Sequence, residues 1–291
     1  MSFILPDLKR MTMRKRQIEK YYQQVENYHQ TIEDSPHESF IVPPELLLQF
    51  FDPEGTIVDV AGGSGINRQI FHLQGGTYIS VDLSLRGLRI AQEGHRGMQL
   101  QASVESLPIR NGSVDTVLCS WSLEHMTDPE IVFDEMVRIV KPGGRILLWG
   151  PNWDNIFRKD FPQFVHKPPE YVWWVRWKIF FRMIKNEFLP FHYNPYINFD
   201  VAALADPNRY ISGDTDAVHC VLCQETYKWF IQKGMFIVHL SDLSEMGKHV
   251  HNGIVIRTLR IILKPLLPVL RRVPFVRWFV IRFPIVVEKP R

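Results

Sequence analysis

Short, continuous apolar runs alternate along the chain with longer stretches whose apolar residues recur at helical spacing. The clearest run contains the β-branched residues Ile57, Val58 and Val60, a composition typical of a parallel strand buried on both faces. The alternation predicts a doubly wound α/β fold around a mostly parallel sheet of seven strands. The expected strands are residues 56–60, 77–82, 99–103, 114–119, 145–149, 235–240 and 284–288.

Between these runs, the spacing of apolar residues predicts helices that cover the sheet. Ser84 is an expected N-cap, and Pro43 and Pro44 are expected to open a helix that continues to Phe51. A helical pattern near the N-terminus carries Tyr28 and is interpreted as a cover helix. The other expected helices are residues 67–73, 84–93, 168–182 and 224–232, and one that starts at Asp128.

A glycine-rich turn follows the first strand, where open α/β sheets bind their ligands. Gly62, Gly63 and Gly65 have no side chains, so a ligand can lie directly against the backbone. Asp82 ends the second strand, where a carboxylate can accept hydrogen bonds from both hydroxyls of a ribose. Arg68 occupies the position of the last glycine in the dinucleotide fingerprint, so the turn does not match a nicotinamide site.

Downstream motifs extend the pattern Asp-x-Ala-x-Gly-x-Gly of residues 59–65. Over roughly residues 40–150, the chain resembles the common "methyltransferase domain" branch of the class I S-adenosylmethionine-dependent methyltransferases. The resemblance implies a Rossmann-like fold, S-adenosyl-L-methionine as cofactor and methyl transfer as activity. The motifs that carry it, in the family's order, are Leu107–Pro108, Asn111–Asp115, Ser120–Met126 and Val140–Arg145.

The resemblance also implies which residues bind the cofactor. In the family, the residue four before the Leu-Pro pair is usually an aspartate that receives the adenine amino group. Here that residue is Ser103, whose hydroxyl forms a weaker hydrogen bond than a carboxylate does. The implied cofactor-binding residues are Asp59, Ala61, Gly62, Gly63, Gly65, Asp82, Leu83, Ser103, Val104 and Ser120.

In the family, residues after the fourth and fifth strands lie beside the transferred methyl group. Residues 120–125 and 152–157 are therefore expected to line the acceptor pocket. His125 is the candidate general base for an oxygen nucleophile, although we favour the interpretation that it caps or packs the following helix. His192 and His219 are further candidates, which spacing does not rank.

Two insertions depart from the family pattern, at residues 151–217 and 246–283. The first contains the aromatic helix 168–182, which could bind a hydrophobic substrate, lie in a membrane interface or pack on the core. In the second, residues 251–283 carry seven Lys and Arg residues and no acidic residue. Prolines and charges interrupt this segment too often for a membrane span, so it is predicted to be an interfacial anchor. A nucleic-acid surface is the less favoured alternative.

Composition limits these interpretations only broadly. With 291 residues and 45% apolar content, the chain can bury one sizeable core, and its net charge of +3 is small. Residues 1–20 are basic and lack the apolar core of a secretory signal. Three cysteines are too few for a disulfide framework, so a reducing cytoplasm is the expected compartment.

A possible metal motif lies in residues 214–223, with Asp214, Asp216, His219 and a Cys-x-x-Cys pair. A structural zinc site needs four soft ligands, and the remaining cysteine, Cys119, belongs to the fourth strand. No metal is therefore expected.

In related methyltransferases a tyrosine-bearing helix at the position of Tyr28 folds over the cofactor, so the resemblance implies a lid as the alternative to a cover helix. Together these observations predict an N-terminal basic, helical lid segment at residues 1–40 and a methyltransferase domain at residues 41–291. The expected function is methyl transfer from S-adenosyl-L-methionine to a hydrophobic or lipid-linked acceptor. The enzyme is expected to be cytoplasmic and peripherally membrane-associated, with no nucleic-acid partner. A soluble methyltransferase of a small polar metabolite or sugar is the alternative; a non-catalytic cofactor-binding or membrane-docking protein is favoured least.

Overall fold

The fold is that of a computed structural model. It describes residues 15–24, 28–29, 48–69, 71–150, 154, 169–191, 193, 196–197, 219–242, 264–270, 272–273 and 281–291. The predicted helix from Pro43, the candidate base His192 and the carboxylates Asp214 and Asp216 lie outside these residues, as do most of the two insertions.

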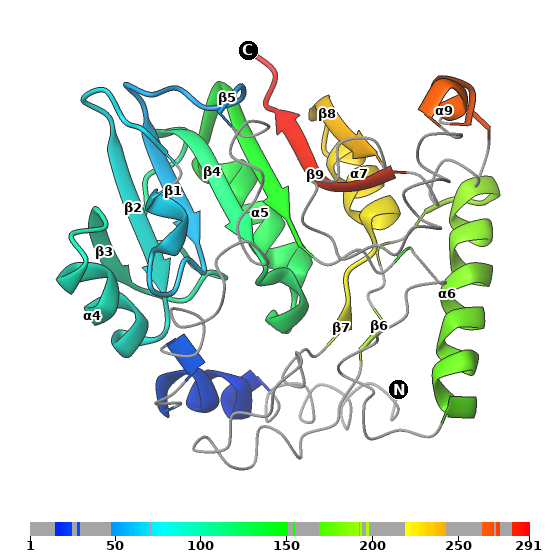
Figure 1. The fold of residues 1–291 in the computed structure, drawn as a ribbon, viewed down its shortest axis with the longest axis horizontal. Coiled ribbons are helices and arrows are strands. Elements are labelled where there is room, and N and C mark those ends of the chain that lie inside the picture. The colour runs from blue at the N-terminus through cyan, green and yellow to red at the C-terminus, as the bar shows by residue number, and fades with distance from the viewer. Residues whose placement is uncertain are drawn as a thin grey trace, which may run out of the picture.

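The centre of the molecule is a seven-stranded sheet with the strand order β3-β2-β1-β4-β5-β9-β8 (Figure 1). Neighbouring strands from β3 to β5 pair in parallel, whereas β9 is antiparallel to both β5 and β8. This is the mixed, doubly wound sheet that the alternation of runs predicts. The strands are β1 (Thr56–Val60), β2 (Thr77–Asp82), β3 (Met98–Gln101), β4 (Val114–Ser120), β5 (Val140–Trp149), β8 (Phe236–Asp242) and β9 (Ile281–Glu288).

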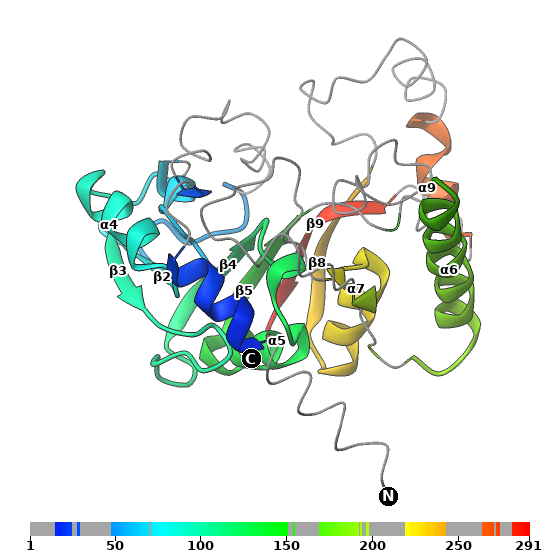
Figure 2. The ribbon, with the colours of Figure 1, turned by 90° about the horizontal axis from the view of Figure 1, so that it is seen from below.

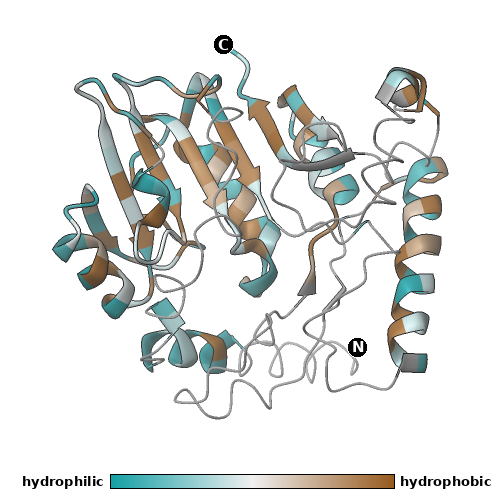
Figure 3. Ribbon diagram, viewed as in Figure 1, coloured by the Kyte–Doolittle hydropathy of each residue, from teal (hydrophilic) through white to brown (hydrophobic). Residues whose placement is uncertain are grey.

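Alternate residues of the central strands enter two apolar clusters, because successive side chains of a strand point to opposite faces. Val58 of β1 joins the larger cluster, whereas Ile57 joins the smaller one with Phe71 and Tyr78. Both faces of the central strands are thus apolar (Figure 3), as expected for parallel strands covered on both sides. The larger cluster draws on α5 (Pro129–Ile139), α6 (Pro169–Phe188) and α7 (Cys223–Gln232).

The helix caps agree with the sequence. Ser84 accepts a hydrogen bond from the Gly87 amide and caps α4 (Leu85–Glu93). Asp128 caps α5 in the same way, through the Ile131 amide. The capping role considered for His125 therefore belongs to Asp128.

Some predicted boundaries were wrong. The expected crossover helix 67–73 is a single 3-10 turn, η2 (Ile66–Gln69), and buried Phe71 packs against Phe51 where the helix was expected to continue. Residues 48–51 form turns rather than the end of a helix. The fifth strand begins at Val140, because the Lys-Pro-Gly-Gly turn forms an irregularity inside it.

The last strand also begins earlier than predicted, at Ile281. Arg282 pairs with Ser241 of β8, so the C-terminal end of the predicted anchor 251–283 belongs to the sheet. The remaining described part of this segment consists of η6 (Lys264–Leu266), α9 (Leu267–Leu270) and residues 272–273.

The aromatic helix α6 is fixed to α7 by a buried polar cluster. Arg182 donates two hydrogen bonds to the carboxylate of Glu225, which is 1% exposed. Asn186 donates a further bond of 2.7 Å to the same carboxylate. Beyond α6, the chain reaches the two-stranded pair β6 (Tyr196–Ile197) and β7 (His219–Cys220). No described helix is long and apolar enough to cross a membrane.

The Arg182→Leu substitution should strongly destabilise the protein, because it leaves the Glu225 carboxylate buried without its cation. The expected loss in the free energy of unfolding is about 3 to 5 kcal/mol, measured by urea denaturation. Lys233→Ala is the matched control, since it removes the exposed Lys233–Asp134 ion pair and should cost no more than about 1 kcal/mol. Equal losses in the two variants would contradict the structural role of the Arg182–Glu225 pair.

Candidate active site

The candidate site lies at the carboxyl ends of β1 and β4, where the strand order reverses. The glycine turn follows β1 directly and is closed by hydrogen bonds from Gly62 N to Val81 O and from Gly65 N to Gly62 O. Gly63 and Gly65 have φ angles of +52° and +68°, which favour glycine. Ala61 has a φ of +57°, so the backbone already leaves ordinary geometry at the first residue of the turn.

Asp59 forms the floor beneath this turn and is fully buried. Its Oδ2 atom accepts hydrogen bonds from the Tyr78 hydroxyl and, at 3.1 Å, from Asn67 Nδ2. Burial raises the pKa of Asp59 from its ordinary 3.8 to about 6, although both hydrogen bonds oppose the shift. A carboxylate that is costly to charge in the folded protein is therefore placed directly below the turn.

Three buried polar atoms around the turn have no hydrogen-bond partner among the described residues: Asp59 Oδ1, Asn67 Oδ1 and Ser80 Oγ. A Cβ atom at Gly62 would lie 2.5 Å from Ser80 Oγ and 2.8 Å from the Asp59 carboxyl carbon. Glycine at this position therefore lets the main chain lie directly against polar side chains that retain hydrogen-bonding capacity.

Asp82 stands at the rim of the site, where the sequence predicts it. Its Oδ2 atom accepts a hydrogen bond of 2.9 Å from Gly63 N, and its Oδ1 atom accepts one of 2.7 Å from Ser84 N. These bonds fix the carboxylate between the glycine turn and the start of α4. An ionised carboxylate has about four lone-pair sites, so capacity remains for two ribose hydroxyls.

His29 packs over the glycine turn, a contact that the sequence analysis missed. A Cβ atom at Gly63 would lie 3.2 Å from the His29 ring, and one at Gly87 would lie 2.8 Å from it. The imidazole is 3% exposed and makes an edge-to-face contact with Tyr28. Hydrophobic periodicity gives no signal for such a contact, because His29 is distant in sequence from the turn it covers.

The helical residues 15–24 lie across the carboxyl ends of the strands (Figure 2). Lys15 forms an ion pair with Glu105, which follows β3, and Tyr22 contacts the His125 ring at 5.9 Å between centroids. Tyr22 also contacts Tyr28 at 5.7 Å. Residues 15–24, 28 and 29 therefore lie over this end of the sheet, and their role as a lid stays a prediction.

The remaining predicted cofactor residues surround the same end of the sheet. Ser103 Oγ accepts a hydrogen bond of 3.3 Å from Glu105 N, and its hydroxyl proton remains available for an adenine nitrogen. Val104 packs against the larger apolar cluster, and Leu83 follows Asp82. Ser120 is the last residue of β4. The structure thus brings all the predicted residues to the carboxyl ends of the parallel strands. Their contacts with a cofactor stay a prediction.

The acceptor side begins at Trp121, whose φ of +51° is strained for a bulky residue. Trp121 N donates to Trp149 O at 2.9 Å, which joins the ends of β4 and β5. The next turn, η3 (Leu123–His125), lies against β7, which contains His219. Two of the candidate bases, His125 and His219, therefore lie on neighbouring elements.

Asp154 is the described residue of the expected acceptor segment 152–157. It is fully buried, and its carboxylate accepts hydrogen bonds of 2.6 and 2.8 Å from the amides of Cys223 and Gln224. Asp154 thus caps α7 and connects the end of β5 to the core. It does not line an open pocket.

The structure describes only the His and Cys residues of the candidate metal motif. Cys220 and Cys223 are buried thiols, and Cys223 opens α7. Among the described residues, no cluster of three or more His, Cys, Asp or Glu side chains could hold a metal ion.

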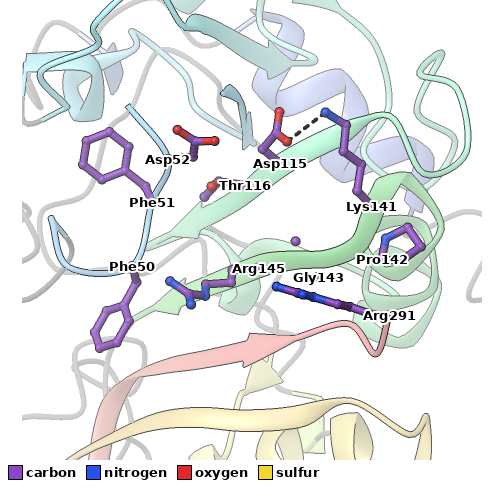
Figure 4. Close-up of a pocket in the computed structure, with 11 residues that line it drawn as sticks. Phe50, Phe51, Asp52, Asp115, Thr116, Lys141, Pro142, Gly143, Arg145 and Arg291 are labelled. Carbon is purple, nitrogen blue, oxygen red and sulfur yellow. Dashed lines mark hydrogen bonds and ion pairs between the residues drawn. The ribbon is translucent and has the colours of Figure 1, made fainter. Parts of the chain in front are cut away.

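A cavity of about 400 Å³ lies elsewhere, at the amino ends of β4 and β5 (Figure 4). Asp115 and Lys141, which line it and form an ion pair with each other, mark the end of the sheet opposite to the glycine turn. Ligands of open α/β sheets bind at the carboxyl ends, so this cavity is separate from the candidate active site.

The site residues fit S-adenosylmethionine. The turn at Gly62 and Gly63 provides an open backbone cradle, and the unpartnered Asp59 Oδ1 and Ser80 Oγ provide buried acceptors beside it. Asp59 and Asp82 give the carboxyl ends of β1 and β2 a negative potential, which suits a ligand with a sulfonium and an ammonium group.

The pKa of Asp59 predicts a distinct pH dependence of stability. The folded protein binds this proton more tightly than the unfolded chain does, so the stability contribution of Asp59 is largest below pH 3.8 and falls as the pH rises through about 6. The difference in unfolding free energy between wild type and Asp59→Asn should change by up to about 3 kcal/mol over this interval, with wild type losing more. Urea denaturation at several pH values measures it. Parallel pH profiles would contradict the raised pKa.

Sequence comparisons agree with this geometry. A family model described as "Methyltransferase domain" matches residues 58–148. An uncharacterized methyltransferase of Mycobacteroides abscessus is 38% identical over 104 residues, covering 34% of this chain and 40% of that protein. The demethylmenaquinone methyltransferase of Streptomyces griseus is 31% identical over 123 residues, covering 40% and 53%. The ubiquinone biosynthesis O-methyltransferase of Paracidovorax citrulli is 37% identical over 95 residues, covering 30% and 40%. The matches thus span about half or less of these relatives.

Solved structures share the fold at low sequence identity. A chain from the complex between the Haloferax volcanii Trm112 methyltransferase activator and a methyltransferase is 12% identical, with a TM-score of 0.54 and coverage of 94% of this chain and 98% of that one. The [4+2]-cyclase SpnF is 13% identical, with a TM-score of 0.50 and coverage of 85% and 79%. These likenesses establish the fold alone. The family match and the glycine turn lead to one conclusion: the chain carries a class I S-adenosylmethionine-dependent methyltransferase domain.

Proposed function

We propose that this protein transfers the methyl group of S-adenosyl-L-methionine to a hydrophobic or lipid-linked acceptor at a membrane surface. The main support for methyl transfer is the position of Asp82. Its carboxylate accepts a hydrogen bond from the Gly63 amide at the point where the strand order reverses, within the residues that match the methyltransferase family model. In this proposal, Asp82 holds the ribose hydroxyls and the glycine turn accommodates the methionine portion of the cofactor. Ser103 and Val104 form the adenine end.

The residues of this chain position the reactants and exclude water. S-adenosylmethionine, when bound, supplies a methyl group activated by its sulfonium sulfur. In-line displacement at that carbon depends on alignment and a dry site more than on strong acid–base help. His29 and Tyr22 cover the carboxyl ends of the strands, where they would shield the reacting atoms from solvent.

A proton acceptor is useful where the nucleophile is a hydroxyl. His125 lies on the acceptor side, in contact with the covering residue Tyr22. We assign it as the candidate base, because the helix-capping role is already filled by Asp128. His219 lies on the adjacent β7 and is the second candidate.

The apolar nature of the acceptor rests on two supports. The matched relatives include enzymes named for demethylmenaquinone and for ubiquinone biosynthesis, whose names point to isoprenoid quinones. In this chain, the next helix after β5 is α6, which carries the exposed residues Trp173, Trp174 and Trp177. Both supports favour an aromatic, membrane-soluble acceptor over a polar metabolite.

Asp82→Ala should weaken the binding of S-adenosylhomocysteine by about 1.5 to 3 kcal/mol, the range for hydrogen bonds to a charged group. Isothermal titration calorimetry measures the change. Asp134→Ala, which removes a carboxylate from the exposed side of α5, is the charge-matched control and should leave affinity unchanged. Unaltered affinity in a folded Asp82→Ala protein would refute the ribose assignment.

The proposed reaction is tested with radiolabelled S-adenosylmethionine and detergent-dispersed demethylmenaquinone as the probe, reduced beforehand with dithionite to its hydroquinone so that it offers a nucleophile. Label should enter the quinone, and a water-soluble analogue without the isoprenoid tail should react more slowly. His125→Gln should lower kcat and remove the acidic limb of its pH dependence, the fall in kcat at low pH where the imidazole is protonated, while KM for the cofactor stays the same. Tight cofactor binding with no label in either acceptor would overturn the proposed acceptor class.

A further inference from the structure

Helix α6 presents an unusually aromatic outer surface. Its exposed residues recur at helical intervals, so they form one continuous stripe along the outside of the helix. Trp174 is 48% exposed, Trp177 52% and Phe181 62%, and Phe188 continues the stripe at 65%. A large aromatic side chain left in water is unfavourable, and a contiguous row of them marks a contact surface.

The opposite face of α6 is firmly packed. Val175, Ile179 and Met183 are at most 2% exposed and belong to the larger apolar cluster. Arg182 and Glu225 fix the rotation of the helix through their paired hydrogen bonds. The aromatic stripe therefore points outward because the helix is held, and its exposure follows from the folded core.

Cations accompany the stripe. Lys178 Nζ lies 3.4 Å from the centroid of the Trp174 ring, and Arg176 Cζ lies 5.1 Å from that of Trp173. Lys185 is also exposed, and of the two acidic residues of α6 Glu170 is exposed whereas Glu187 is partly buried. Tryptophan beside lysine or arginine is the composition found where a helix lies in a bilayer interface.

A second exposed apolar element lies on the same side of the molecule as α6, because Figures 1 and 2 both place α9 there. Leu266 of η6 and Val269 of α9 are 49% and 61% exposed, and Arg272 follows at the surface. The two elements together give a surface with aromatic, aliphatic and basic residues on one side of the protein.

We propose that α6 and α9 dock on the surface of an anionic bilayer, with the aromatic stripe of α6 inserted among the headgroups. The occupant is a membrane rather than a second copy of this chain, because the exposed Lys178 and Lys185 make this face basic and two basic faces repel each other, whereas an anionic bilayer attracts them. The helix has too many charges to span, so it lies in the plane of the interface. This inference rests on the proposed function only in taking the acceptor from the same bilayer.

The proposed contact also connects to the acceptor side. After α6, the chain continues through Phe191 and Tyr193, which pack on the core near Phe133, and then reaches β6, which pairs with β7 beside η3. A bilayer held against α6 would therefore contact the segment that leads to η3, the turn that contains His125. An apolar acceptor could enter from the membrane without crossing bulk water.

The experiment is co-sedimentation of the full chain with phosphatidylcholine vesicles that contain phosphatidylglycerol. Wild type should bind, and Trp177→Ser combined with Phe181→Ser should weaken partitioning by about tenfold or more, because the inserted apolar area is lost. Ile131→Ser, which replaces an exposed apolar residue of α5, is the matched control and should bind as wild type does. Lys178→Glu with Lys185→Glu should weaken binding to the anionic vesicles and reduce its salt sensitivity.

Each outcome decides the inference. Absence of wild-type binding, or equal binding by the Trp177/Phe181 variant at unchanged thermal stability, overturns it. Sedimentation equilibrium in which wild type dimerises and the same variant does not assigns the stripe to self-association and also overturns it. Methyl transfer to detergent-dispersed demethylmenaquinone is measured separately: activity without vesicle binding rejects the docking surface alone, whereas vesicle binding without activity rejects the proposed function alone.

Discussion

The burial of the Asp59 carboxylate beneath the glycine turn is the constraint on which the candidate site depends. Burial raises the pKa of a carboxylate, as it does for Asp59, and destabilises the folded protein unless nearby hydrogen-bond donors compensate. Tyr78 and Asn67 supply these donors, which ties the end of β1 to β2 and to η2. Because Gly62 has no side chain, the main chain can close over this group. The shape of the cofactor cradle and the position of a charge beneath it therefore have one common cause.

The second strand carries the other half of the site through ordinary strand geometry. Tyr78 and Ser80 point to the region below the turn, and Asp82, at the carboxyl end, reaches Gly63 and Ser84. One strand thus supplies a donor to the buried carboxylate and the carboxylate expected to hold the ribose. Polar residues within an otherwise apolar strand are costly in the core, so their presence in β2 indicates a site.

The sequence alone predicted the strands, the sheet class and the position of the glycine turn and Asp82. These features rest on local patterns: β-branched runs, glycine spacing and the N-cap at Ser84. It predicted neither the contact of His29 with Gly63 nor the support of Asp59 by Tyr78, since both depend on contacts between separate elements. The expected helix 67–73 failed because Phe71 enters the core against Phe51 and Tyr78, a tertiary contact that outweighs local helical spacing.

Helix α6 shows why the aromatic insertion could not be interpreted from sequence. Its composition fits core packing, substrate binding and membrane contact equally well, and the structure places different residues in different roles. Val175, Ile179 and Met183 pack inside, while the tryptophans and Phe181 remain outside. Its hydrophobic periodicity is blurred because both faces are apolar, so the helix that fixes itself to the core also exposes a row of aromatic rings. Rigid attachment matters to such a surface: with the rotation of α6 set by Arg182 and Glu225, little conformational entropy is lost when the outer face meets a partner.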